Sequence, residues 1–378
     1  MRFLLDPLPN TDISEERLTK WYRDCMEVRD TGGAERVLLT ALQSGSDENG
    51  LFKMMSQAVT DHYYMNGGHA LDFHNKAFES LNYVGSEQRK YILASLVPMF
   101  GDAQRSEELY SWQSPVNLVQ PLKEVFEELS RMGEVSAEKR IDDDELLQVL
   151  LGDDPFTTIR VLKEALFGGT SPVRIAQITA LAAAERIVRF HTQNDFGDWI
   201  SVLHTFTHAH AVHESLIRSS DPWIVRGIFH SAATIYLDRF LNIPPAPRPT
   251  VAVPSDPIPN SEELLDILDK RQQVAQAGAW VTRYLRGGGE PEPLFNVLGH
   301  ALLREDADFH TFQMYEAALA EFDHWSSESG SFAEKARETL ILAITRYLAA
   351  HAPTARETPQ TARIAWRLHR GEKLFEEE

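Results

Sequence analysis

The sequence predicts an all-α protein, either a multi-helix bundle or stacked helical pairs, with internal repeat phrases and one extended proline-rich segment. Apolar residues recur at three- and four-residue spacings through almost all of the 378 residues, whereas alternating strand-like runs are scarce. Helix start and stop signals are frequent, and two similar helix-like phrases occur far apart in the chain. Together these features favour a dozen or more helices.

Helix start or stop signals are clear at four places in the sequence. Ser171-Pro172 and Asp221-Pro222 each resemble an N-cap followed by proline at the first helical position. Residues 166–169 (LFGG) and 285–289 (LRGGG) resemble helix ends, where glycine can adopt the left-handed conformation.

Residues 242–260 interrupt the helical pattern, because they hold seven of the nineteen prolines. Proline removes backbone donors and breaks helices, so we expect this segment to be extended. It divides the chain into a helical part at 1–241 and a second at 261–378. The segment is either a linker between the two parts or an ordered strap across one compact domain.

Composition excludes several classes of function. Hydrophobic and charged contents of 43% and 25% are those of an ordinary folded protein, and the net charge of −19 argues against nucleic acid and against anionic membranes. No apolar run approaches the ~18 residues of a membrane span, and the N-terminus lacks a secretory apolar region. Cys25 is the sole cysteine, which excludes internal disulfides and thiolate clusters and favours a cytoplasmic location.

The two similar phrases each combine Gly-His-Ala-Leu with Asp-Phe-His, at residues 68–74 and within 299–310. Each phrase therefore carries two histidines and a preceding glycine. Because Gly68 and Gly299 have no side chain, another helix or a ligand could approach the backbone beside His69 and His300.

Histidines cluster in three windows, which hold ten of the fourteen in the chain: His62, His69 and His74; His204, His208, His210, His213 and His230; His300 and His310. Neutral imidazole is a common metal ligand, and helices deliver such ligands at i,i+4 or from facing helices. The windows therefore indicate a shared metal site.

Helical periodicity separates the histidines of residues 204–213 into two faces. His204 and His208 are four residues apart on one face, which we expect to point inward. His210 and His213 lie on another face and are expected to be exposed or to contact a partner. His62 is separated from His69 by the glycine pair and is a weaker candidate.

His230 lies within a strongly apolar helical run, where a lone histidine is most simply a core residue. Several such histidines on separate helices instead favour a common site. Ligating histidines usually donate their second N–H to a carboxylate or carbonyl. Asp72, Asp238 and Asp306 are the acidic candidates for this supporting role, although helix capping is a strong alternative for Asp306 and for Asp308.

Four stretches resemble a family of bacterial helical proteins annotated for a Rieske iron–sulfur module, in which a histidine-containing helical region precedes the module. They are NGGHALDFHNKAFESLNYVG, FTHAHAVHESLIR, IYLDRFLNIPPAPRP and EDADFHTFQMYEA, and the similarity runs from Asp61 to residues 367–372. A Rieske cluster requires two cysteines and two histidines. With one cysteine, this chain resembles the helical region alone and carries no iron–sulfur cluster.

More distantly, the same phrases are similar to questin oxidase-like proteins, some of which are non-haem iron oxygenases acting on aromatic polyketides, with several histidines and a modified lysine around the metal. That resemblance implies a divalent metal, most simply iron, and zinc is the alternative because imidazole ligands suit it as well. It implies His69, His204, His230, His300 and His310 as ligands. His208 is a further candidate from its i,i+4 spacing with His204, not from the resemblance. Lys76 is the lysine that could reach such a site.

Three functions follow as expectations. The first is a metal-dependent oxidoreductase, a non-haem iron oxygenase acting on an organic, possibly aromatic, small molecule in an apolar pocket. The second is a non-catalytic helical scaffold or a subunit that docks to a separate electron-transfer protein, with histidines as packing residues. The third is a zinc hydrolase, which needs a carboxylate base near the same ligands.

Overall fold

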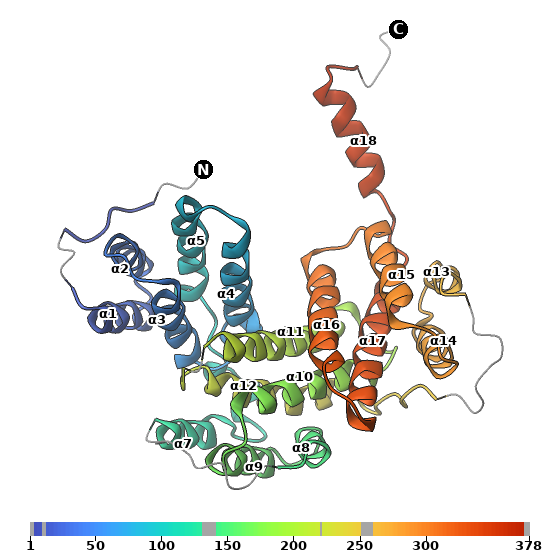
Figure 1. The fold of residues 1–378 in the computed structure, drawn as a ribbon, viewed down its shortest axis with the longest axis horizontal. Helices are drawn as coiled ribbons and strands as arrows, with labels where there is room; N and C mark the ends of the chain where they lie inside the picture. Colours follow the sequence, from blue (N-terminus) through green and yellow to red (C-terminus); the bar gives the residue numbers. More distant parts are fainter. Residues whose placement is uncertain (1–3, 10–12, 131–140, 220, 251–259, 374–378) are drawn as a thin grey trace. The chain divides into compact units, whose positions relative to one another are not determined.

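A computed structural model describes residues 4–9, 13–130, 141–219, 221–250 and 260–373. Within these ranges the chain forms eighteen α-helices and no strand, so the all-α prediction is confirmed (Figure 1). None of the helices in the described ranges is long and apolar enough to cross a bilayer.

The chain folds as two compact units. Unit 1 comprises Met1–Ala183 and His204–Leu241, and unit 2 comprises Ala184–Leu203 and Asn242–Glu378. The boundary falls inside α10 (Pro172–Val188) and α11 (Phe196–Arg218), so each unit receives part of both helices.

The other helices divide between the units without overlap. Unit 1 also holds α1 (Glu15–Glu27), α2 (Thr31–Gln43), α3 (Glu48–Asp61), α4 (His69–Ser80), α5 (Arg89–Gly101), α6 (Tyr110–Gln113), α7 (Val119–Leu129), α8 (Asp143–Leu150), α9 (Pro155–Phe167) and α12 (Val225–Leu237). Short 3₁₀ turns in unit 1 include η1 (Met65–Gly68), η4 (Ser106–Glu108) and η5 (Asp238–Leu241). Unit 2 holds α13 (Glu263–Leu268), α14 (Val274–Arg286), α15 (Pro291–Arg304), α16 (Phe309–Ser326), α17 (Ser331–His351) and α18 (Thr358–His369).

Most of the predicted helix signals are confirmed. Helix α10 begins at Pro172. Gly169 and Gly288, each two residues after the end of α9 and α14, have φ values of +93° and +88°. The predicted start at Asp221-Pro222 is wrong, because α12 begins only at Val225. The Asp221 carboxylate instead caps the turn at residues 222–224, which precedes α12, by accepting a hydrogen bond from Trp223 N at 2.9 Å.

The core of unit 1 lies where α12 meets α11 and α4. Helix α4 packs against both α3 and α5. On α12, a Cβ added to Gly227 would lie 2.6 Å from a Val212 methyl group of α11 and 3.5 Å from Leu71 of α4. Phe206, Ile228 and their neighbours on these helices are fully buried, and each such side chain stabilises the fold by about 1.5–3 kcal/mol.

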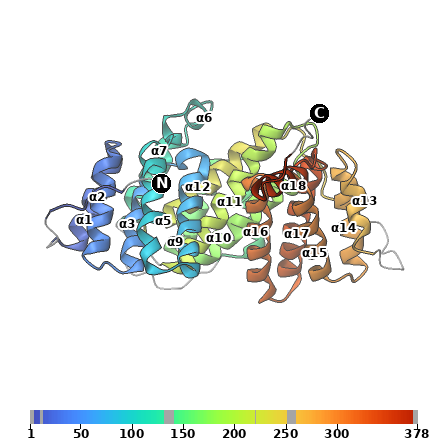
Figure 2. The same cartoon turned by 90° about the horizontal axis from the view of Figure 1, so that it is seen from above.

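In unit 2, α17 is the central helix, because α14, α15 and α16 all pack on it (Figure 2). Every residue from Thr339 to Ala349 is buried, so this stretch is surrounded on all faces. It includes Arg346, whose guanidinium donates to Phe190 O at 2.7 Å and to Val274 O at 3.5 Å. Burial lowers the pKa of Arg346 to about 10.

The described part of the proline-rich segment, residues 242–250, belongs to unit 2 and is bonded to residues 185–191 of the same unit. Asn242 donates to Arg189 O at 2.8 Å and accepts from His191 N at 2.9 Å, and Ala246 N also donates to Arg189 O. Arg248 pairs with the buried Glu185. Residues 251–259 lie outside the described ranges, so the predicted division of the chain at 242–260 stays a prediction.

The last described helix, α18, is exposed along its whole length (Figure 1). Its first turn is capped from elsewhere in unit 2, because the Asp306 carboxylate accepts from Glu357 N and Thr358 N at 2.8 Å each.

The two similar phrases fold differently. In the first, residues 69–74 form the continuous start of α4. In the second, Gly299 and His300 lie near the end of α15, and α16 starts only after Asp308 caps it. The extra residues between the two halves of the second phrase allow the helix to end, and therefore the likeness in sequence is not a likeness in local structure.

Candidate metal-binding site

The connection from α3 to α4 is built from left-handed backbone. Tyr64, Asn66, Gly67 and Gly68 have φ values of +42°, +53°, +63° and +91°. Left-handed backbone costs a residue with a side chain about 1–2 kcal/mol, and such strain concentrates at functional sites when the surrounding structure enforces it. The turn ends at His69, which is the first residue of α4.

Gly68 is required by close packing as well as by its backbone angle. A Cβ at this position would lie 2.8 Å from Tyr64 Cε2 and 3.1 Å from His208 Cβ of α11. The prediction that glycine lets another helix approach beside His69 is therefore confirmed. It is also confirmed at Gly299, where a Cβ would lie 3.1 Å from the Tyr315 hydroxyl of α16.

This close approach brings His69 beside His204 of α11. The two ring centroids are 4.3 Å apart, and ring nitrogens of the two residues lie within 4.8 Å of each other. Both side chains are half-buried. Phe73, one turn along α4, covers the His69 ring with a centroid distance of 5.7 Å. The predicted inward pair therefore includes His204, with a partner from the first phrase.

His208 lies one turn after His204 and is only 2% exposed. Its Nδ1 lies 2.9 Å from the Ser231 hydroxyl of α12, and its ring packs edge-on against Tyr64 at a centroid distance of 4.9 Å. Burial lowers the pKa of His208 to about 3, so the ring is neutral at neutral pH.

His230 is also buried and neutral, since burial holds its pKa well below the ordinary value. Its ring lies 5.4 Å from Tyr63 and 5.5 Å from Phe126, and 6.3 Å from the ring of His208. Its Nε2 has no hydrogen-bond partner among the described residues. The side chain is thus held in an aromatic setting, close to one other candidate ligand.

His74, the second histidine of the first phrase, is a core residue. Its ring packs between Phe52 at 4.7 Å and Phe78 at 4.9 Å, and burial lowers its pKa to about 3. This histidine belongs to the packing of α3 against α4.

The predicted supporting carboxylates of unit 1 are both buried, Asp72 at 1% and Asp238 at 6% exposure. Both lie near Tyr64, whose pKa is raised first by burial and then by the charges of Asp238 and Asp72. Lys76, which the sequence placed near the site, forms an ion pair with Glu79 of the same helix at 2.9 Å.

The expectation that His210 and His213 are exposed is wrong. Their side chains are 0% and 2% exposed. Helical spacing correctly separates them from His204 and His208, but α11 is covered on that face too, as the burial of Ala211 and Val212 indicates. Only the packing of the unit reveals that this helix has no solvent face there.

The remaining candidates lie in unit 2. His300 is exposed on α15, so the expectation of a shielded ligand is wrong for this residue. His310 lies in the first turn of α16 with its Nδ1 3.0 Å from the Asp308 carboxylate, and it stays a candidate from the sequence. Asp306 and Asp308 are helix caps, as the alternative interpretation predicted.

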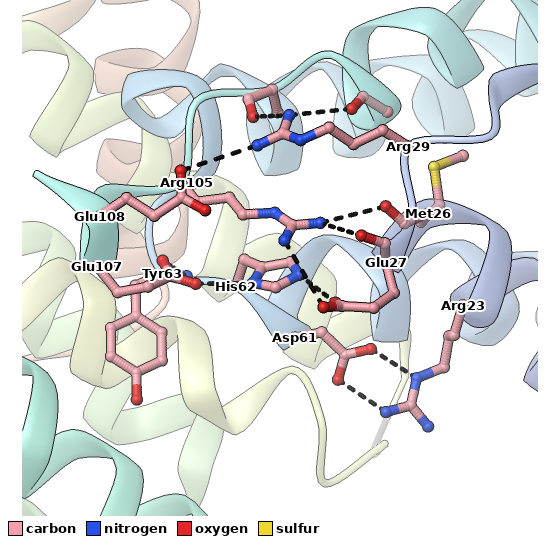
Figure 3. Close-up of polar contacts among 12 residues, drawn as sticks. Arg23, Met26, Glu27, Arg29, Asp61, His62, Tyr63, Arg105, Glu107 and Glu108 are labelled. Atoms are coloured by element: carbon pink, nitrogen blue, oxygen red, sulfur yellow. Dashed lines mark hydrogen bonds and ion pairs between the residues drawn. The ribbon is translucent and has the colours of Figure 1, made fainter.

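His62 has a different role, visible in Figure 3. Its Nδ1 lies 2.7 Å from Glu107 of η4 and its Nε2 lies 2.7 Å from Glu27, the last residue of α1. These carboxylates are 45 and 35 residues distant along the chain, so sequence spacing gave no signal of the arrangement.

Sequence reasoning also missed Ser231 as a partner of His208. Its position directly after His230 is the signal that the sequence offers. Consecutive residues of a helix point about 100° apart, so Ser231 and His230 can contact different neighbouring helices.

Comparison of the chain with protein-family models, with curated proteins and with solved structures finds no match. The resemblances to the Rieske-associated helical region and to questin oxidase-like proteins, and the cytoplasmic location, therefore stay predictions from the sequence.

Proposed function

We propose that this protein is a metal-dependent oxidoreductase in which His69 and His204 bind a divalent transition metal, iron first. The observation that carries the proposal is the approach of these two half-buried imidazoles, at a centroid distance of 4.3 Å, from separate helices. The left-handed turn that ends at His69 adds support, because enforced backbone strain is characteristic of functional sites.

The donor chemistry fits a transition metal. Imidazole suits iron, copper, nickel and zinc, and hard ions such as magnesium prefer oxygen. Two nitrogens that share one ion at about 2.0–2.1 Å lie at most about 4.2 Å apart. Ring nitrogens already within 4.8 Å therefore need only a small side-chain rotation.

When bound, such a metal would supply redox chemistry toward an organic small molecule, with a separate electron-transfer protein as the source of electrons. The chain's own residues hold the ligands in place. Gly68 allows α11 to approach α4, and Phe73 shields one side of the His69 ring. His208, one turn after His204 on α11, and His230 on α12 are neutral imidazoles, so neither adds a positive charge to this part of unit 1.

The decisive test is metal content after anaerobic reconstitution of the tag-free chain with iron, and separately with zinc. We expect about one ion per chain by mass spectrometry, and loss of that ion in His69→Ala and in His204→Ala. His369→Ala is the matched control, because His369 is exposed on α18. A wild-type chain that retains no metal, or two variants that retain it fully, would contradict the proposal.

A non-catalytic helical scaffold is the second candidate, and a specific observation favours it. His74, His208 and His230 are buried against aromatic rings, as packing residues would be. Under this alternative His69→Ala lowers the free energy of unfolding without changing the metal content, so the same experiment separates the two. A zinc enzyme would retain zinc in preference to iron and show no redox activity.

A further inference from the structure

The turn before His69 is tied to one neighbouring segment, residues 104–107. Ser106 N donates to Tyr63 O at 3.0 Å, and the Ser106 hydroxyl donates to Tyr64 O at 3.1 Å. Asn66 N donates to Gln104 O at 2.7 Å. These bonds hold the backbone that leads into the left-handed residues.

His62 completes this attachment at the start of the turn (Figure 3). One oxygen of Glu107 lies 2.7 Å from His62 Nδ1, and the other accepts from Tyr63 N at 2.9 Å. Glu27 binds the opposite ring nitrogen at 2.7 Å and thereby connects the turn to α1. Arg105 donates to Glu27 O at 2.8 Å, which fixes the end of that helix.

The geometry requires a protonated ring. Each carboxylate can only accept, so both ring nitrogens must donate, and only the imidazolium form has two N–H groups. Burial by itself lowers the pKa of His62, and Arg105 lowers it further. The hydrogen bonds and charges of Glu107 and Glu27 outweigh these effects, so the pKa lies above its ordinary value. His230, on α12, is a further titratable neighbour, and its own pKa is lowered in part by His62. Tyr63 also faces Glu107, whose charge adds to burial in raising the pKa of the Tyr63 phenol.

We infer that His62 is a positioning residue, which as an imidazolium clamps the 62–68 turn between Glu27 and Glu107 and so holds His69 beside His204. This inference rests on the proposed function for its metal readout, but the clamp itself can be measured without metal. His62 touches neither of the paired histidines in the described contacts, and acts through the backbone of the turn.

Titration gives the clamp a window of pH. It forms when Glu107 is ionised and His62 is protonated, and Glu107 has a lowered pKa because its hydrogen bonds outweigh burial. When the pH rises through the elevated pKa of His62, the ring loses one of its two N–H groups. The carboxylate at that nitrogen then faces a nitrogen lone pair instead of a donor. Metal affinity should therefore rise with pH as the ligands deprotonate, and then fall on an alkaline limb as the clamp opens.

The experiment uses the full chain and two readouts, with Glu27→Gln as the principal variant. The Glu27 side chain is 62% exposed, so this substitution removes one clamping charge without disturbing the core. Hydrogen exchange of the 62–70 backbone is measured in metal-free protein, and iron(II) affinity is measured against pH. Two variants of His62 itself complete the set: His62→Gln removes the cation, and His62→Arg replaces it with a permanent cation that has several donors. Glu16→Gln on the exposed face of α1 is the matched control.

We expect Glu27→Gln to lose protection of the 62–70 backbone and to shift the alkaline limb to lower pH, with iron affinity reduced about tenfold, as for other groups that orient ligands. His62→Arg should abolish the alkaline limb. Unchanged protection in Glu27→Gln and in His62→Gln would overturn the inference. A chain that binds no iron yet loses protection would support the clamp and contradict the proposed function instead.

Discussion

Substitution of Gly68 by alanine tests the closest contact of the candidate site. The φ of +91° costs an alanine about 1–2 kcal/mol. The new Cβ would also lie 2.8 Å from the Tyr64 ring and 3.1 Å from His208 Cβ, and both of these side chains are buried. Overpacking of this kind costs about 1–3 kcal/mol more. The free energy of unfolding should therefore fall by about 2–5 kcal/mol.

Gly45 provides the matched control. Its φ is +84°, but a Cβ there meets nothing within 4 Å, so Gly45→Ala carries the backbone cost alone. Equilibrium urea unfolding followed by circular dichroism should place Gly68→Ala about 1–3 kcal/mol below Gly45→Ala. Iron content should fall in the Gly68 variant only, because the added methyl group pushes α4 and α11 apart and so separates His69 from His204. Equal destabilisation of the two variants would refute the argument that close packing requires Gly68.

The other predictions concern buried histidines. His74 and His208 have folded pKa values of about 3, below the ordinary 6.5, so the unfolded chain binds more protons as the pH falls through 6.5. Each of these two histidines should therefore make the free energy of unfolding about 2 kcal/mol lower at pH 5 than at pH 8. In His74→Phe one of the two contributions is gone, so the loss of stability between pH 8 and pH 5 should be about 2 kcal/mol smaller than in the wild type. Urea unfolding at the two pH values measures this, and equal losses in variant and wild type would be the contrary result. Ser231→Ala removes the partner of the buried His208 Nδ1 and should cost about 1–3 kcal/mol, whereas the exposed Ser95→Ala should cost far less; a Ser231 variant as stable as the Ser95 variant would count against the hydrogen bond.

Local sequence signals were reliable where the physics is local. Pro172 and Gly169 mark helix ends because proline and left-handed glycine act within a few residues, and the absence of a side chain at Gly68 and Gly299 predicted close approach. The same local logic failed at Asp221, where an N-cap pattern capped a turn instead of a helix.

Features that depend on long-range packing could not be predicted. Helical periodicity separates the faces of α11, but it does not show that His210 and His213 are buried as well. Nothing in the local sequence marks Tyr64 as left-handed, and its carbonyl accepts a hydrogen bond from the Ser106 hydroxyl, which lies 42 residues away in the chain. The Glu27–His62–Glu107 arrangement joins three separate segments for the same reason.

The most direct measurement is a crystal structure of the iron-reconstituted full chain, with anomalous diffraction used to locate the metal. The account predicts one strong anomalous peak about 2.0–2.2 Å from a ring nitrogen of His69 and of His204 alike. A peak elsewhere, or His69 and His204 rings packed together in reconstituted crystals without any metal between them, would contradict it.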